Sequence, residues 1–409
     1  MSETRTVVAK EFESIVAGQA PGVRRRYLKD NLARWVVWIG GLSVIGALLL
    51  IFFYLVSEVA PLFGGASLEA RQQFVPPGAQ SSQTLYVAAE EQGEIGLRVA
   101  GDGSLAFFDL YTGAARAQVS LPLDGAALTE VAEISAADNL LVAALDDGRV
   151  LPFKHSYRVS YPDDKRLIEA EVSYPDGEVP LAFSPSGQSL KSLVARDNGS
   201  TLMLAAVETS GDVVFKRFEQ TESLFDDAQT TEGPLLRFTP PIPADQLLLE
   251  PLLNWLYVLD REGGRIALYR IDGDDAPQLV GTYEVGVPID MARYLAGGIS
   301  IVVSQADGEI SQWFPARDVD GEFYLARIRE FRLRKDHRVT AISPEQRRRT
   351  FAVGDDQGNV SLFYATSGSR LAFRKRASKN IFDSAGGCGE KESRSGCKTS
   401  LRTMKSSGE

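Results

Sequence analysis

LYVLDREGGRIALYRI (256–271) consists of two alternating apolar runs joined by an acidic, glycine-containing turn. Five other segments repeat the pattern: LRVAGDGSLAFFDL (97–110), LVAALDDGRVLPF (141–153), SLVARDNGSTLMLAA (192–206), IVVSQADGEISQWF (301–314) and FAVGDDQGNVSLFYA (351–365). An Asp-Gly or Asn-Gly pair between alternating runs is a strong signal for a β-hairpin, because the tight turn needs residues that tolerate positive φ. The sequence therefore predicts six hairpins.

The turn glycines of these hairpins recur at fairly even spacing. The intervals between them are 45, 51, 65, 44 and 50 residues, and the glycines are Gly103, Gly148, Gly199, Gly264, Gly308 and Gly358. Repeats of roughly 40–50 residues that contain only short strands are typical of β-propeller blades. A blade cannot bury both of its faces alone, so blades stack radially. We predict an all-β, propeller-like domain of six or seven blades over residues 84–370. A pair of two-sheet sandwiches with similarly spaced hairpins is the alternative.

Two of the repeats resemble a known family of propellers. LAFSPSGQSL (181–190) and TAISPEQRRRTFAVGDDQGNVSLFY (340–364) are similar to the core of WD40-type blades. The Gly-His and Trp-Asp dipeptides of that family are absent. The resemblance therefore implies a WD40-like fold and no particular partner.

A long uncharged segment precedes the repeats. WVVWIGGLSVIGALLLIFFYLV (35–56) contains 22 consecutive residues without a charge, and a helix that crosses a bilayer needs roughly 20. Trp35 and Trp38 lie at one end and Tyr54 at the other, where aromatic side chains favour the membrane interface. The segment is longer than the apolar core of a secretory signal and lacks a convincing cleavage site. We predict a single-pass anchor in contact with membrane lipid; a buried helix of a soluble domain is the alternative.

Basic residues flanking this segment predict its orientation. They precede the segment and are Arg24, Arg25, Arg26, Lys29 and Arg34, whereas the next basic residue after it is Arg71. The positive-inside rule places such a cluster in the cytoplasm. The expected arrangement is a cytoplasmic N-terminus and an extracytoplasmic domain.

Composition limits the partners and the chemistry. The formal net charge is −10, which gives no sign of a nucleic-acid partner. Neither His155 nor His337 has the spacing of a metal-ligand motif. Five Asp pairs raise the alternative of calcium sites, but they lie mostly at predicted hairpin turns and form no D-x-D-x-D-G loop. We therefore expect no catalytic, metal or cofactor site and no enzymatic activity.

One basic concentration stands out in the predicted propeller. It consists of Arg347, Arg348 and Arg349, close in sequence to Arg329, Arg332, Arg334 and Lys335. Such a cluster can contact an anion or a lipid headgroup, or it can be the solvated edge of a blade. The sequence leaves both readings open.

The anchor and its flanks also resemble a transporter family. RRRYLKDNLARWVVWIGGLSVIGALLLIFFYLVSEVAPLFGGA (24–66) is similar to the first transmembrane segment of long-form PstC-type phosphate ABC transporter permeases, which carry a large β-rich insertion after that helix. The resemblance implies a place in the bacterial inner membrane with a periplasmic propeller. It also implies three partners: a second permease subunit, an ATPase subunit and a periplasmic phosphate-binding protein.

The chain departs from that family in one respect that matters for transport. Such permeases continue into further transmembrane helices that form the phosphate path, whereas this sequence contains one apolar span. No substrate-path residue can therefore be transferred to it. The resemblance predicts an accessory docking domain that does not transport phosphate alone. A free-standing membrane-tethered scaffold or sensor and a propeller enzyme are the alternatives.

The C-terminal residues differ from the rest of the chain. Residues 371–409 hold nine Lys or Arg, four Asp or Glu, and both cysteines, Cys388 and Cys397. The alternating pattern is lost from about Gly368, which we interpret as a reading-frame shift or as a disordered basic tail. The predicted organisation has five parts: a cytoplasmic segment (1–34), the membrane helix (35–56), a linker (57–83), the propeller (84–370) and the atypical tail (371–409).

Overall fold

The computed structural model describes residues 21–63, 68, 73–221, 229–271, 276–333, 337–345 and 348–375. The chain divides into two compact units, Met1–Ala66 and Ser67–Glu409. The first unit contains helix α2 (Pro21–Val59) and the short 3₁₀ helix η1 (Ala60–Phe63). The second unit contains all the strands. The C-terminal residues 376–409, with both cysteines, lie outside the described residues.

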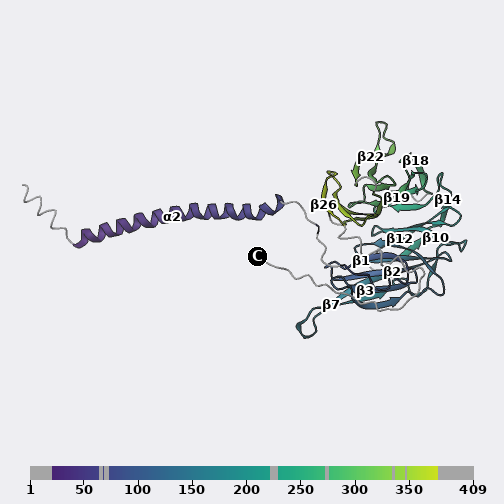
Figure 1. Ribbon diagram of the computed structural model, residues 1–409, viewed down its shortest axis with the longest axis horizontal. Coiled ribbons are helices and arrows are strands. Elements are labelled where there is room, and N and C mark those ends of the chain that lie inside the picture. Colours follow the sequence, from purple (N-terminus) through teal and green to yellow (C-terminus); the bar gives the residue numbers. More distant parts are fainter. Residues whose placement is uncertain are drawn as a thin grey trace, which may run out of the picture. The chain divides into compact units, whose positions relative to one another are not determined.

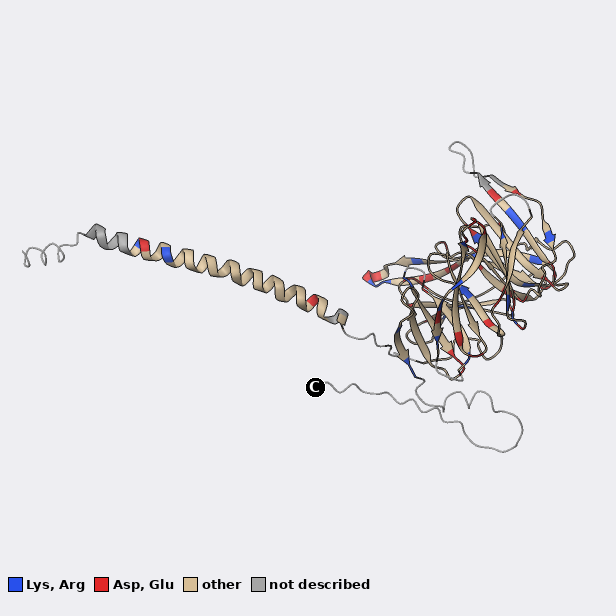
Figure 2. Ribbon diagram, turned by 90° about the horizontal axis from the view of Figure 1, so that it is seen from above, with Lys and Arg blue, Asp and Glu red and all other residues tan. Residues whose placement is uncertain are grey.

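Helix α2 contains the predicted apolar segment. Its part Leu28–Val59 has a mean hydropathy of 2.5 and is not buried by the rest of the protein, so it is long and apolar enough to cross a membrane. A signal sequence near the N-terminus would have the same properties. Figure 2 shows the long uncharged stretch of the helix. Among the predicted flanking residues, the described side chains are all exposed: Lys29, Arg34, Trp35, Trp38 and Tyr54. The side chains of Arg24, Arg25 and Arg26 lie outside the described part.

The second unit is a six-bladed β-propeller, which confirms the predicted fold and fixes the number of blades. The first sheet contains β1 (Thr84–Ala89), β2 (Ile95–Ala100), β3 (Ser104–Asp109) and β4 (Ala115–Ser120). The second contains β5 (Leu128–Ser135), β6 (Leu140–Leu145), β7 (Arg149–Ser160) and β8 (Leu167–Ser173), with β9 (Leu181–Ala182) on β7; the 3₁₀ helix η2 (Pro162–Asp164) joins β7 to β8. The third contains β10 (Leu190–Asp197), β11 (Thr201–Glu208), β12 (Val213–Thr221) and β13 (Gln229–Glu232), with β14 (Leu236–Phe238) on β12.

The last three sheets each have four consecutive strands. The fourth contains β15 (Gln246–Leu249), β16 (Trp255–Asp260), β17 (Arg265–Arg270) and β18 (Gln278–Glu284). The fifth contains β19 (Ile289–Tyr294), β20 (Ile301–Gln305), β21 (Glu309–Arg317) and β22 (Phe323–Arg332). The sixth contains β23 (Val339–Pro344), β24 (Thr350–Asp355), β25 (Val360–Tyr364) and β26 (Arg370–Arg374). Figure 1 shows the sheets in sequence order, from blue at β1 to yellow at β26.

Five of the predicted hairpins join the second and third strands of one sheet, whereas the hairpin at Gly199 joins the first and second strands, β10 and β11, of the third sheet. All six turn glycines have positive φ, between 63° and 93°. At Gly308 a Cβ atom would lie 2.3 Å from the carbonyl oxygen of His337, and at Gly264 it would lie 2.4 Å from that of Val287. These two turns therefore need glycine for a second reason, because the connection to the next sheet crosses directly over them.

The end of the propeller differs from the prediction in one detail. Strand β26 (Arg370–Arg374) pairs with β25 beyond the predicted boundary at residue 370, so the expected loss of strand structure from Gly368 is wrong for these residues. The sixth sheet thus has its four strands. Before the first sheet, residues 73–83 do not form a free linker, because they pack on the sheet: the ring of Phe74 lies 5.8 Å from that of Phe108.

Neighbouring sheets are held together by apolar clusters. Along a strand, successive residues belong in turn to the cluster on one face of the sheet and to the cluster on the other. In the fifth sheet, Ile301 and Val303 face the fourth sheet, whereas Val302 and Ile310 face the sixth. Five such clusters join the six sheets in sequence. Among the described residues, no cluster joins the sixth sheet to the first.

The sixth sheet consequently has one covered and one half-exposed face. Phe351, Val353 and Phe363 are buried against the fifth sheet. The intervening residues on the other face, such as Ala352, Val360 and Leu362, are only partly buried, whereas the corresponding strands of the fifth sheet are buried on both faces. We call this half-exposed surface of β24 and β25 the open face. The equivalent surface of the first sheet is covered by residues 73–83.

We expect truncations on the two faces of the sixth sheet to have unequal effects on stability. Val353→Ala removes two fully buried methyl groups and should lower the free energy of unfolding by about 2 kcal/mol. Val360→Ala removes the same atoms from the open face and should cost roughly a quarter of that. Chemical unfolding of the full chain in detergent measures both values. Equal losses would mean that the open face is covered as completely as the other.

Candidate functional site

The first strand of each sheet lies nearest the propeller axis. Side chains on several of these strands form hydrogen bonds with the backbone of the first strand of the following sheet. Consecutive first strands contact one another in the series β1, β5, β10, β15, β19 and β23. The carboxylate of Glu130 on β5 accepts a hydrogen bond from the amide of Leu193 at 2.8 Å, and Ser192 Oγ accepts one from the amide of Leu247 at 2.7 Å. The side chain of Gln246 then bonds both the carbonyl and the amide of Ala292, at 2.8 and 3.1 Å. These bonds connect the second to fifth sheets.

A pair of opposite charges belongs to first strands on opposite sides of the ring. Glu130 lies on the second sheet and Arg293 on the fifth. Burial raises the pKa of Glu130 above its usual value, although backbone amides donate to its carboxylate. For Arg293 the same loss of hydration lowers the pKa, because it again disfavours the charged form. The negative charge of Glu130 opposes that shift. Arg293 is accessible to water but surrounded by enough protein to lose part of its hydration, as expected for a side chain near the axis.

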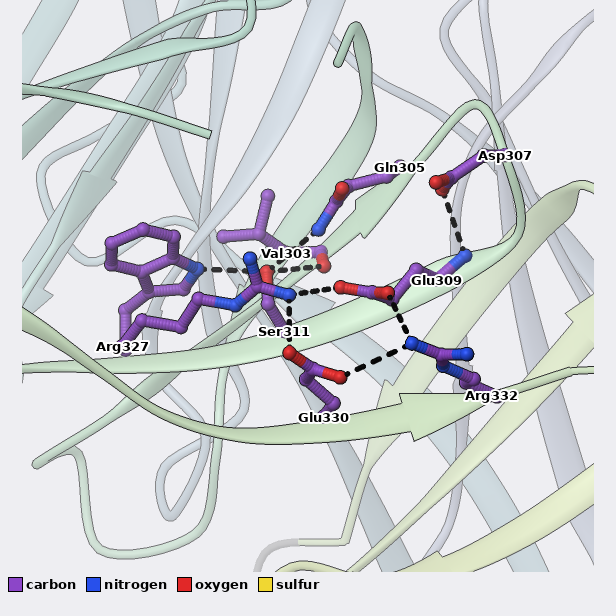
Figure 3. Close-up of polar contacts among 9 residues, drawn as sticks. Val303, Gln305, Asp307, Glu309, Ser311, Arg327, Glu330 and Arg332 are labelled. Atoms are coloured by element: carbon purple, nitrogen blue, oxygen red, sulfur yellow. Dashed lines mark hydrogen bonds and ion pairs between the residues drawn. The ribbon is translucent and has the colours of Figure 1, made fainter. Parts of the chain in front are cut away.

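The fifth sheet contains a buried polar cluster beside an exposed ionic one (Figure 3). The indole nitrogen of Trp313 donates to Ser311 Oγ at 2.8 Å, and the side-chain amide of Gln305 donates to the same oxygen at 3.0 Å. Next to it, Arg327 pairs with Glu309 and with Glu330. Arg332 pairs with the same two carboxylates, at 3.3 and 3.4 Å. Because the ion pairs are partly exposed, we expect the buried serine to contribute more to stability.

Removal of the Ser311 hydroxyl should be costly, because two buried donors would lose their acceptor. We expect Ser311→Ala to lower the free energy of unfolding by about 2 kcal/mol. Ser361→Ala is the matched control, since Ser361 occupies the equivalent position in β25, is also buried, and makes no side-chain hydrogen bond to the described residues. Its change should stay below about 0.5 kcal/mol. A loss for Ser361→Ala as large as that for Ser311→Ala would contradict this account.

One trio of possible metal ligands occurs among the described residues: His337, Asp355 and Asp356. Its geometry is that of a capped hairpin turn. Nδ1 of His337 lies 2.6 Å from Asp355 Oδ2, and the side-chain amide of Asn359 donates to both oxygens of Asp355. Burial would raise the pKa of Asp355, but the hydrogen bonds from Asn359 and His337 outweigh it and hold the pKa below its usual value. His337 thus ties the connection between the fifth and sixth sheets to the turn of the sixth.

The other histidine is a packing residue in the second sheet. His155 is 2% exposed, and its ring meets that of Tyr157 edge-on at 5.5 Å. Its Nδ1 has no hydrogen-bond partner among the described residues. Burial lowers the pKa of His155 to about 4. The imidazole is therefore neutral at pH 7 and can be protonated in the folded state only at a cost.

His155 should make the propeller sensitive to acid. Since its pKa is about 4 when folded and about 6.5 when unfolded, the unfolded chain binds the proton first as the pH falls. The stability that depends on keeping the His155 imidazole neutral is complete above about pH 6.5. It falls between about pH 6.5 and 4 and is lost below that, so the free energy of unfolding should decrease by about 3 kcal/mol over this range. Unfolding of wild type and His155→Leu across this range tests the prediction. The two proteins should differ in pH dependence, and parallel curves would contradict it.

The basic residues that the sequence groups together do not form one cluster in the structure. Arg329 donates to the carbonyl of Ala365 at 2.5 Å and to Gln312 Oε1 at 3.2 Å, so it joins the fifth and sixth sheets. Arg332 belongs to the ionic cluster of Figure 3. Arg348 and Arg349 remain exposed between β23 and β24. Arg334, Lys335 and Arg347 lie outside the described residues. Sequence reasoning missed Arg370, which follows the β25–β26 turn and is also exposed.

Comparison with known proteins found a structural neighbour and no similar sequence. No protein-family model matches the sequence, and no curated protein sequence is similar to it. Among solved structures, the chain is similar to the crystal structure of the β-propeller domain of Cps50 (Swd1) from Myceliophteria thermophila. The identity is 13%, the TM-score is 0.44, and the match covers 72% of this chain and 87% of that chain.

Proposed function

We propose that this chain is the membrane-anchored docking part of a phosphate ABC importer permease. The observation that carries the proposal is an apolar helix of membrane-spanning length joined by a short segment to a six-bladed propeller. The sequence of that helix and its flanks resembles the first transmembrane segment of PstC-type permeases, in which a β-rich insertion follows. Propellers present wide, rigid faces that suit protein docking.

The proposed arrangement has the N-terminus in the cytoplasm and the propeller in the periplasm of a bacterial inner membrane. The basic residues before the apolar segment favour this orientation. The docking partners would be the second permease subunit, the ATPase subunit or the periplasmic phosphate-binding protein. One helix of membrane-spanning length occurs among the described residues, and one helix cannot by itself enclose a polar path through lipid, so the role we propose is docking within an assembly.

A second candidate is a free-standing, membrane-tethered scaffold or sensor. It needs only the apolar helix and the propeller, both of which are present. The polar and charged clusters of the described residues fit either candidate without catalysis, because their side chains mainly hold neighbouring strands and turns together. The identity of the docked protein distinguishes the two candidates.

Site-specific photo-cross-linking in phosphate-limited Gram-negative cells tests the proposal. A photoreactive residue at Val319, which is fully exposed at the β21–β22 turn, should give an adduct with a phosphate-importer subunit. The same residue at the buried Val302 of the same sheet should give none. Expression in cells without a phosphate permease should leave phosphate uptake at background. Adducts with unrelated proteins alone would favour the scaffold, and restored uptake would refute the docking role.

A further inference from the structure

The sixth blade carries a charge opposite to that of the rest of the propeller. Residues 337–375 contain seven Lys or Arg and three Asp or Glu, whereas residues 73–336 contain 22 and 41. The first five blades are therefore strongly acidic as a group, and the sixth is basic. This separation of charge gives the domain an electric dipole. An anionic surface therefore attracts the sixth blade and repels the acidic remainder of the propeller.

Three exposed arginines of this blade lie at the same end of its sheet. Arg348 and Arg349 lie between β23 and β24, and Arg370 follows the turn between β25 and β26. In an antiparallel sheet of consecutive strands these two connections share one end, and the amide of Ala365 bonds the carbonyl of Arg349 at 2.7 Å. The nearby described carboxylate is Glu345, 3.7 Å from Arg348. We call Arg348, Arg349 and Arg370 the basic corner.

The chain enters the propeller at the same end, on the neighbouring blade. Phe74 packs against Phe108 and closely over Gly113 in the β3–β4 turn. Farther along, the carbonyl of Ser82 accepts a hydrogen bond from Arg98, and Ser82 Oγ accepts one from the amide of Asp102 beside the β2–β3 turn. Residues 73–83 thus run from the β3–β4 end of the first sheet to its other end. The β3–β4 and β25–β26 turns occupy the same face of the ring.

The covalent chain limits how far this face can move from the apolar helix. Residues 60–72 connect α2 to the segment that begins near Phe74, and a fully extended chain of that length spans at most about 45 Å. If α2 spans a membrane, the face that holds the basic corner is therefore the tethered face. Arginines near an anionic bilayer each contribute about 1 kcal/mol of attraction, over a range of roughly a Debye length.

We propose that the basic corner binds anionic lipid headgroups of the membrane that α2 spans, and so holds the propeller against it by its sixth blade. The inference rests on the membrane anchor of the proposed function. Headgroups fit better than a protein partner, because the three arginines lie exposed at the tethered end, two in the β23–β24 loop and one at the start of β26, whereas the apolar surface of this blade is the open face. The acidic charge of the other five blades makes the contact one-sided.

Fluorescence quenching in vesicles tests this proposal on the full chain. Cys388→Ser and Cys397→Ser leave a single label at Thr366→Cys, in the exposed β25–β26 turn. The protein is reconstituted in phosphatidylcholine alone or mixed with phosphatidylglycerol, with a quencher attached to the headgroups. We expect stronger quenching in the anionic vesicles and its loss at high salt. Each of Arg348→Gln, Arg349→Gln and Arg370→Gln should lower the docking equilibrium about fivefold.

Two controls separate a specific contact from general attraction. A label at Gln357→Cys, at the other end of the sixth sheet, should not be quenched in either vesicle. Removing two positive charges at that other end, with Arg374→Gln and Lys375→Gln, should leave quenching at residue 366 within about twofold of the parent, because those residues lie farther from the bilayer.

The possible results lead to different conclusions. Equal quenching in neutral and anionic vesicles, or stronger quenching at residue 357, would overturn the lipid contact. So would arginine changes that leave quenching intact but abolish the cross-link to an importer subunit, since the corner would then bind protein. Alkaline extraction reports separately on α2. A chain released by that treatment would refute the membrane anchor itself, whereas an inserted chain without charge-dependent quenching would refute the lipid contact alone.

Discussion

A four-stranded sheet has two faces, and a propeller is stable only if neighbouring sheets cover both. The strands of this protein meet that requirement by alternation. In β20, Ile301 and Val303 pack on one neighbour and Val302 on the other. The same division recurs from sheet to sheet and accounts for the five apolar clusters. The requirement also explains the tight turns at Gly264 and Gly308, because sheets that pack this closely bring each inter-sheet connection onto the preceding hairpin.

The ends of the propeller show how the requirement is met where a neighbour is not packed in the same way. Residues 73–83 cover the outer surface of the first sheet, and the buried Arg98 is held there by carbonyl and hydroxyl oxygens of that segment and of Thr84. The sixth sheet has no comparable cover among the described residues, and its open face carries small or medium apolar side chains. Stability is therefore expected to be lowest at this side of the ring, where fewer apolar atoms leave water.

Polar groups in the interior serve the same packing. The Glu130, Ser192 and Gln246 side chains satisfy backbone groups of the next first strand, where regular strand pairing cannot reach. Within the fifth and sixth sheets, Ser311 and Asp355 instead accept hydrogen bonds from the buried side chains of Trp313 and Asn359. The surface loops are free of this constraint and can carry charge for binding. The contrast in charge between the acidic first five blades and the basic sixth links the proposed membrane anchor to a definite side of the domain.

The sequence by itself determined the elements that depend on local chemistry. Alternating apolar runs around acidic, glycine-containing turns predicted six hairpins, because strand periodicity and positive φ are properties of neighbouring residues. The apolar run 35–56 likewise predicted a helix of membrane-spanning length. Tertiary structure alone decided which faces are covered, since the cover comes from residues distant in sequence. It placed Arg370 at the same end of the sixth sheet as Arg348 and Arg349, joined Arg329 to the carbonyl of Ala365, and extended the sixth sheet through β26. Short charged loops contain no periodicity that would reveal such neighbours. These side chains come to one corner only because the strands pair in the order β23, β24, β25 and β26.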